Sequence, residues 1–122
     1  MNVVIGVDPH KASHTAVAID EAEDEISSVK VRATRRQVEQ LVRWAEPFEK
    51  RRWAIESAGG TGYLLAQQLV AQGEVVLDVP ATLASRIRVL GTGRSNKNDP
   101  NDAHSIAVAA FSGPKPAQRR GS

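Results

Sequence analysis

The chain opens with an apolar run, Val3–Val7, which is rich in β-branched residues and stops at Asp8. Such a run is typical of a central strand that is covered on both faces. Apolar and polar positions then alternate with a period of two over residues 14–19 and again over 26–33, which predicts two further strands. Turns separate these three segments, so we expect an antiparallel meander.

Helical spacing follows the meander. Thr34 and Gln37 have the spacing of a capping box, and the apolar residues after them recur every three or four positions. This pattern predicts an amphipathic helix that ends near Pro47. The remaining predicted elements are, in order, a strand over 53–55 that ends at Glu56, a glycine-rich loop over 57–62, a helix over 63–72 closed by Gly73, a strand over 75–77, a short helix after Pro80, a polar basic loop over 91–97 and a helix over 100–111.

The order of these elements predicts an α/β fold with a five-stranded mixed sheet flanked by helices. The later strands follow helical crossovers and should therefore run parallel to the first strand. Asp8 and Glu56 then both lie at the carboxyl ends of strands. Open α/β sheets place their functional sites at that edge.

Two further acids stand where the last predicted helix begins. Pro100 favours the first helical position, which makes Asp99 a natural N-cap and Asp102 the third helical residue. One interpretation is a capping box with Asp in place of the usual Glu or Gln. The other is half of a metal site, because residues three apart share one helix face.

If the last helix begins at the same edge of the sheet, Asp99 and Asp102 join Asp8 and Glu56 there. Four oxygen ligands suit Mg²⁺ or Mn²⁺ rather than zinc. Two such ions about 4 Å apart can serve phosphoryl transfer, by activating the attacking oxygen and stabilising the leaving one. Capping and metal binding are compatible roles for these two aspartates.

Length and composition bound the class of protein. A chain of 122 residues forms one domain with a core of ordinary size. Because there is no cysteine and only three scattered histidines, disulfide frameworks and thiolate or histidine-rich metal sites are disfavoured. No signal peptide and no membrane-spanning stretch is recognisable, so we expect a cytoplasmic protein without a membrane partner.

The formal net charge of +2 is by itself a weak indication of an anionic partner. Its distribution is more informative. If cations neutralise the four candidate acids, the 16 basic residues exceed the remaining acids clearly. Such a surface suits phosphate, and the basic residues expected to contact a nucleic-acid backbone are Lys11, Arg86, Arg88, Arg94 and Lys97.

Three motifs in this order and spacing resemble a known family. They are Gly6-Val7-Asp8-Pro9-His10-Lys11, Ile55-Glu56-Ser57-Ala58 with Gly60 and Tyr63, and Lys97-Asn98-Asp99-Pro100-Asn101-Asp102-Ala103. Together they resemble the DEDD transposases of bacterial insertion sequences, family one-ten, also called bridge-RNA-guided recombinases and related to Piv-type invertases. The resemblance covers roughly residues 2–111. Asn98, in place of a hydroxyl residue, and an extra glycine after Glu56 depart from the family pattern, and neither change touches a carboxylate.

The resemblance implies an RNase H-like, RuvC-like domain over 1–111, with 112–122 as a tail or the start of a linker. It implies that Asp8, Glu56, Asp99 and Asp102 are catalytic residues that bind Mg²⁺ or Mn²⁺. DNA is the implied partner. The resemblance is also compatible with a guide RNA as a second partner and implies a homo-oligomer of the full-length protein. Family members continue into a second domain that supplies a serine nucleophile, so this stretch alone is expected to show little or no turnover.

Other interpretations stay open. The domain could be a non-catalytic module that binds nucleic acid or self-associates, and metal-dependent strand cleavage would separate that class from a recombinase. The loop over 57–62 also faintly resembles a phosphate loop of actin-like ATPases, which close two domains over a nucleotide. His10 and Lys11 either touch a phosphate or form an exposed turn. We expect His104 to be structural, and Trp44 and Trp53 to lie in the core rather than stack on bases.

Overall fold

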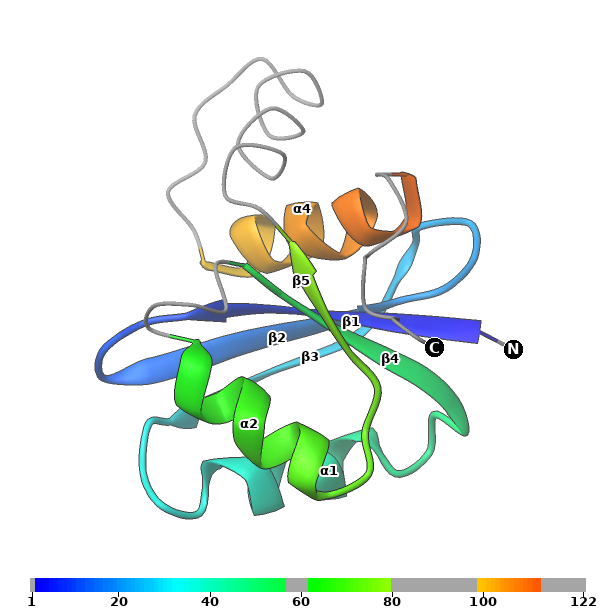
Figure 1. Cartoon of the computed structure of the whole chain (residues 1–122). Coiled ribbons are helices and arrows are strands. Elements are labelled where there is room, and N and C mark those ends of the chain that lie inside the picture. Colours follow the sequence, from blue (N-terminus) through cyan, green and yellow to red (C-terminus); the bar gives the residue numbers. More distant parts are fainter. Residues whose placement is uncertain (1, 57–61, 80–98, 113–122) are drawn as a thin grey trace.

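The computed structural model describes residues 2–56, 62–79 and 99–112. The predicted glycine-rich loop, the short helix after Pro80 and the basic loop over 91–97 lie outside these residues, apart from Gly62. The elements are β1 (Asn2–Pro9), β2 (Ser13–Ile19), β3 (Glu25–Arg32), α1 (Gln37–Ala45), β4 (Lys50–Glu56), α2 (Tyr63–Ala71), β5 (Val76–Val79) and α4 (Asp99–Ser112) (Figure 1).

The five strands form one mixed sheet in the order β3-β2-β1-β4-β5. β1 pairs antiparallel with β2, and β2 antiparallel with β3. β4 runs parallel to β1, and β5 runs parallel to β4. The predicted meander, the parallel crossovers and the five-stranded mixed sheet are therefore confirmed.

Helices cover both faces of the sheet, with α1 and α2 on one side and α4 on the other (Figure 1). Alternate residues of β1 serve two separate cores, because successive side chains of a strand point to opposite faces. Val3, Ile5 and Val7 pack with residues of α1 and α2. Val4 packs in the cluster that contains Ala103, Ile106 and Ala107 of α4. This two-sided burial explains the uninterrupted apolar run at the start of the chain.

The predicted capping box at the start of α1 is wrong. α1 begins at Gln37, and its N-cap residue, Arg36, makes no side-chain capping bond. The Thr34 hydroxyl instead accepts a hydrogen bond from the Arg36 amide at 3.2 Å. The Gln37 side chain turns into the protein, where it is 4% exposed and bonds to His14 and Gln68. The Gln37 side chain, which a capping box would use to cap the helix, is thus engaged in tertiary hydrogen bonds instead.

Several boundaries also shift by a few residues. α1 ends at Ala45 rather than near Pro47. β5 covers Val76–Val79, so it includes Asp78, while Val75 lies before it. α2 ends at Ala71, and Gly73 after it has a φ of +87°. A glycine suits this left-handed conformation because it has no Cβ.

Both tryptophans pack in the protein, as expected. Trp53 is fully buried, and its indole N–H donates to Glu74 at 2.7 Å. Trp44 donates its indole N–H to the Ser27 hydroxyl at 3.0 Å and contacts Phe48 edge to face. No helix in the described ranges is long and apolar enough to cross a membrane.

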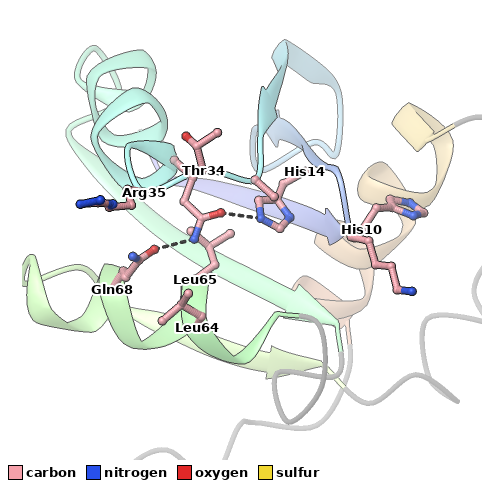
Figure 2. Close-up of a pocket in the computed structure, with 10 residues that line it drawn as sticks. His10, His14, Thr34, Arg35, Leu64, Leu65 and Gln68 are labelled. Carbon is pink, nitrogen blue, oxygen red and sulfur yellow. Dashed lines mark hydrogen bonds between the residues drawn. The ribbon is translucent and has the colours of Figure 1, made fainter.

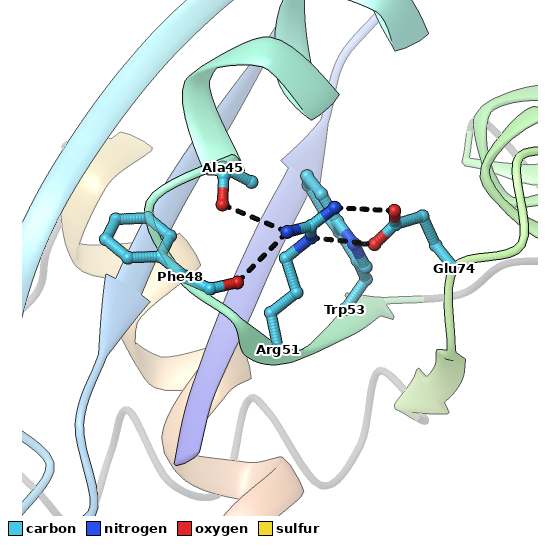
Figure 3. Close-up of polar contacts among 5 residues, drawn as sticks. All are labelled: Ala45, Phe48, Arg51, Trp53 and Glu74. Carbon is cyan, nitrogen blue, oxygen red and sulfur yellow. Dashed lines mark hydrogen bonds and ion pairs between the residues drawn. The ribbon is translucent and has the colours of Figure 1, made fainter. Parts of the chain in front are cut away.

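A polar network ties the ends of α1, β4 and α2 together (Figure 3). Arg51 donates two hydrogen bonds to the Glu74 carboxylate, at 2.9 and 2.8 Å. It also donates to the backbone carbonyls of Ala45 and Phe48, at 3.2 and 3.0 Å. The side chains of Arg51 and Glu74 are only 18% and 11% exposed. The hydrogen bonds from Arg51 lower the pKa of Glu74.

This network predicts that Glu74→Gln lowers the free energy of unfolding by about 2 kcal/mol, the usual scale for hydrogen bonds to a charged group. Urea unfolding at pH 7 measures the change. Glu39→Gln is the matched control, because the Arg36–Glu39 pair is 75% and 63% exposed and such pairs contribute little. An equal loss of unfolding free energy in Glu74→Gln and Glu39→Gln would contradict a stabilising role for the buried Arg51–Glu74 network.

The difference in unfolding free energy between wild type and Glu74→Gln should also depend on pH. Because folding lowers the pKa of Glu74, its stabilising contribution is complete above the unfolded-state pKa and is lost as pH falls through the lowered folded-state pKa. The stability difference between wild type and Glu74→Gln should therefore be constant near pH 7 and shrink below about pH 4.5. A difference that grows on acidification would contradict this account.

Candidate functional site

Asp8 and Glu56 lie beside each other at the carboxyl edge of the sheet. The last paired residues of β1 and β4 are Val7 and Ile55, so Asp8 and Glu56 are the next positions on two adjacent parallel strands. Adjacent strands are roughly 4.8 Å apart. Both acids were expected at strand ends, and the parallel register now makes them neighbours.

The two acids also share one face of the sheet. Asp8 is two residues beyond Gly6, which lies directly beneath α4, and Glu56 is two residues beyond Ala54, which packs in the α4 cluster. Because side chains alternate along a strand, both carboxylates belong to the face that α4 covers. Asp8 is 6% exposed, and Glu56 is half-buried.

Gly6 allows α4 to approach this face. A Cβ atom at residue 6 would lie 2.1 Å from the carbonyl oxygen of Ala103 and 2.6 Å from the amide nitrogen of Ala107. The backbone of β1 at Gly6 therefore packs directly against the backbone of α4, and this contact leaves no space for a side chain at residue 6. α4 lies with its amino end toward the carboxyl end of β1 (Figure 1).

α4 begins at Asp99, one residue before the predicted start at Pro100. Proline is compatible with the first turn, because the N–H that it lacks has no intrahelical acceptor there. Asp99 and Asp102 both belong to this first turn. Their side chains lie outside the described residues, so their capping and metal-binding roles stay predictions.

His10 connects Asp8 to the turn after β1. Its Nε2 atom lies 3.1 Å from the Asp8 carboxylate, and the two side chains are 48% and 9% exposed, respectively. Lys11, the next residue, is exposed. The sequence predicts either a phosphate contact or an exposed turn for His10, and its position two residues after Asp8 is the signal for the observed contact.

Among the side chains that the structure describes, no group of three His, Cys, Asp or Glu could hold a metal ion. Asp8 and Glu56 supply two of the four predicted ligands at one edge, and the other two belong to the undescribed side chains of α4. The predicted phosphate contacts Arg86, Arg88, Arg94 and Lys97 also lie outside the described residues. His104, expected to be structural, contacts the backbone carbonyl of Glu23 at 3.1 Å.

A polar relay that the sequence did not reveal lies on the opposite face of the sheet. It is the hydrogen-bonded chain of His14 in β2, Gln37 in α1 and Gln68 in α2. The His14 ring and the Gln37 amide oxygen are 2.7 Å apart, and the Gln37 amide donates to Gln68 at 2.6 Å (Figure 2). Burial is the main cause that lowers the pKa of His14. The signal in the sequence was that His14 occupies an inward position of β2, on the same side as Ala16.

Comparisons with known proteins identify the family. A model of the DEDD transposases of the IS110 family matches residues 5–120. The chain belongs to this family. It is 36% identical over 106 residues to an uncharacterised 44.8 kDa protein of insertion element IS116 from Streptomyces clavuligerus. That match covers 87% of this chain and 26% of the relative, so the chain spans about a quarter of the length of the relative.

Solved structures with low sequence identity share the fold. RuvC of Thermus thermophilus, in complex with a Holliday junction substrate, is 16% identical with a TM-score of 0.65, covering 91% of this chain and 94% of its own. The large terminase nuclease of thermophilic phage G20c is 13% identical with a TM-score of 0.65, covering 89% and 82%. The RuvC-like fold and the transposase family implied by the three motifs are therefore confirmed.

The position of α4 in this transposase domain depends on Gly6, which gives a direct test. Gly6→Ala should push α4 away from β1, because overpacking of this kind costs about 1–3 kcal/mol. Hydrogen exchange should show that the amides of residues 103–110 lose protection by at least roughly tenfold, while β2 and β3 stay paired.

Gly73→Ala is the matched control. Its Cβ would meet nothing within 4 Å, and its positive φ makes the substitution strained, at a cost of about 1–2 kcal/mol. It should destabilise the domain without selectively exposing α4. Unchanged protection of α4 in Gly6→Ala would show that the helix does not depend on this contact.

Proposed function

We propose that this domain is the metal-binding catalytic part of a DNA transposase, in which Asp8, Glu56, Asp99 and Asp102 hold Mg²⁺ or Mn²⁺. The observation that carries the proposal is that Asp8 and Glu56 occupy neighbouring positions on adjacent parallel strands, on the face covered by α4. Two carboxylates at that spacing fit within the reach of a pair of ions about 4 Å apart.

Helical spacing supports the inclusion of the two acids of α4. Positions 99, 102, 103 and 106 follow the i, i+3, i+4, i+7 pattern of one helix face. Ala103 and Ile106 are fully buried in the cluster between α4 and the sheet. Extending this stripe into the first turn of the helix supports the inclusion of Asp99 and Asp102 in the proposed site.

The donor set suits the proposed ions. Carboxylate oxygens are hard ligands, which favour Mg²⁺ and Mn²⁺ over zinc. When bound, such ions supply charge stabilisation for the attacking and leaving oxygens of a phosphodiester. In the protein, Asp8 is buried at the end of β1, and its carboxylate contacts the His10 ring. Both features favour a fixed position for this carboxylate at the edge of the sheet.

DNA is the proposed partner. The chain belongs to a transposase family, and Thermus RuvC, which shares its fold, was solved in complex with a Holliday junction substrate. Lys11 stands exposed next to His10, where it could contact a backbone phosphate together with Arg86, Arg88, Arg94 and Lys97. The motif resemblance extends the proposal to a guide RNA, to a homo-oligomer, and to strand exchange that needs a second, serine-bearing domain.

A calorimetric Mn²⁺ titration tests the metal site. Asp8→Asn and Asp102→Asn should each weaken Mn²⁺ binding roughly a hundredfold, because even loss of a residue that only orients a ligand lowers metal affinity by about 10- to 100-fold. Asp78→Asn is the matched control. Asp78 pairs with Ile55 near the same strand ends, on the opposite face of the sheet from Glu56.

Three results would count against the proposal. Equal heats from wild type and Asp8→Asn would remove the metal site altogether. A loss in Asp8→Asn without any loss in Asp102→Asn would return Asp102 to helix capping. A loss in Asp78→Asn as large as in Asp8→Asn would mean that binding is not confined to the α4 face. In the first case, a non-catalytic module that binds nucleic acid would be the better account.

A further inference from the structure

A cavity of about 310 Å³ lies on the face of the sheet opposite the candidate metal site. It opens between the turn after β1 and the first turns of α1 and α2 (Figure 2). Its volume is at the lower end of the range for small-ligand sites. The lining residues are His10, Lys11, His14, Ala33, Thr34, Arg35, Gln37, Leu64, Leu65 and Gln68.

The lining combines three kinds of surface. Leu64 and Leu65 of α2 form an apolar side, and Leu64 is 61% exposed although it is a large apolar residue. The relay of His14, Gln37 and Gln68 forms a polar side. Lys11 and Arg35 add positive charge, and none of the described residues that line the cavity carries a carboxylate. The cavity therefore suits a ligand that is partly apolar and carries an anionic group.

The hydrogen bonds of Gln37 fix the orientation of the His14 ring. The Gln37 amide nitrogen donates to Gln68, so its oxygen faces His14 and accepts from Nε2–H. Burial lowers the pKa of His14, so the ring is neutral at pH 7 and its Nδ1 atom carries a lone pair. In the described part of the chain this Nδ1 atom is buried and has no hydrogen-bond partner, so it is closed to a ligand that fills the open cavity. His14 therefore gives the lining a neutral ring rather than a charged group.

The two helices reinforce the preference for an anion. α1 and α2 both begin at the cavity, and the N-cap residue of each makes no side-chain capping bond. The first amides of a helix carry partial positive charge and bind anions. Together with Lys11 and Arg35, these helix starts favour a phosphate at the mouth of the cavity.

We propose that this cavity holds one unpaired nucleotide of a nucleic-acid strand, with its phosphate at Lys11 and Arg35 and its base or sugar between Leu64 and His14. Nucleotides combine an anionic phosphate with a flat, partly apolar base, which matches the basic and apolar sides of the lining. The proposal rests on nucleic acid being the partner of the domain. His10 lines the cavity and also contacts Asp8, so a strand held here would pass around the end of β1 toward the candidate metal site.

Fluorescence anisotropy with a labelled single-stranded decanucleotide, as DNA and as RNA of the same sequence, tests the proposal in EDTA. Arg35→Ala and Leu64→Ala should each weaken binding by roughly five- to tenfold. Arg36→Ala and Val70→Ala should change it by less than about twofold, since these neighbours are exposed and do not line the cavity. Either strand type supports the proposal, and the stronger binder identifies the source of the nucleotide.

Two outcomes would overturn the proposal. Equal weakening by Arg35→Ala and Arg36→Ala would mean diffuse attraction to a basic surface. Weakening by Arg35→Ala with no effect of Leu64→Ala would mean a phosphate site without a nucleotide. Because EDTA removes divalent ions, the result does not depend on the metal site. Failure of the Mn²⁺ titration would therefore leave this result standing, and failure here would leave the metal site standing.

Discussion

The contact of α4 with Gly6 is the constraint on which the candidate site depends. Only a residue without a Cβ allows the carbonyl of Ala103 and the amide of Ala107 to approach β1 so closely. Small residues of α4 continue this approach, since Ala103, Ala107 and Ala109 are all buried. The first turn of the helix, with its two aspartates, is thereby held near the end of the strand that carries Asp8.

The burial of β1 on both faces also determines where the candidate site residues lie. A strand packed on both faces leaves its functional groups only at its end, where Asp8 and the turn with His10 and Lys11 emerge. The parallel register with β4 then places Glu56 next to Asp8. The same strand end separates two chemically different sites, with carboxylates on the α4 face and a basic, partly apolar cavity on the other.

Sequence patterns predicted those parts of the fold that depend on local order. The apolar run of β1, the alternation in β2 and β3, and the acids at strand ends all follow from spacing along the chain. Spacing could not predict the burial of Gln37, because its partners His14 and Gln68 are 23 and 31 residues away. The bond from Arg51 to Glu74, 23 residues apart, was invisible for the same reason.

The most direct test of the central claim is paramagnetic broadening of amide NMR signals by substoichiometric Mn²⁺. If the four carboxylates share one site, the signals of Asp8, Glu56 and the first turn of α4 should broaden together, while those of the acidic turn at residues 20–25 keep their line widths. Broadening confined to residues 20–25, or broadening at Asp8 and Glu56 that leaves α4 unaffected, would contradict a metal site built from these two strands and this helix.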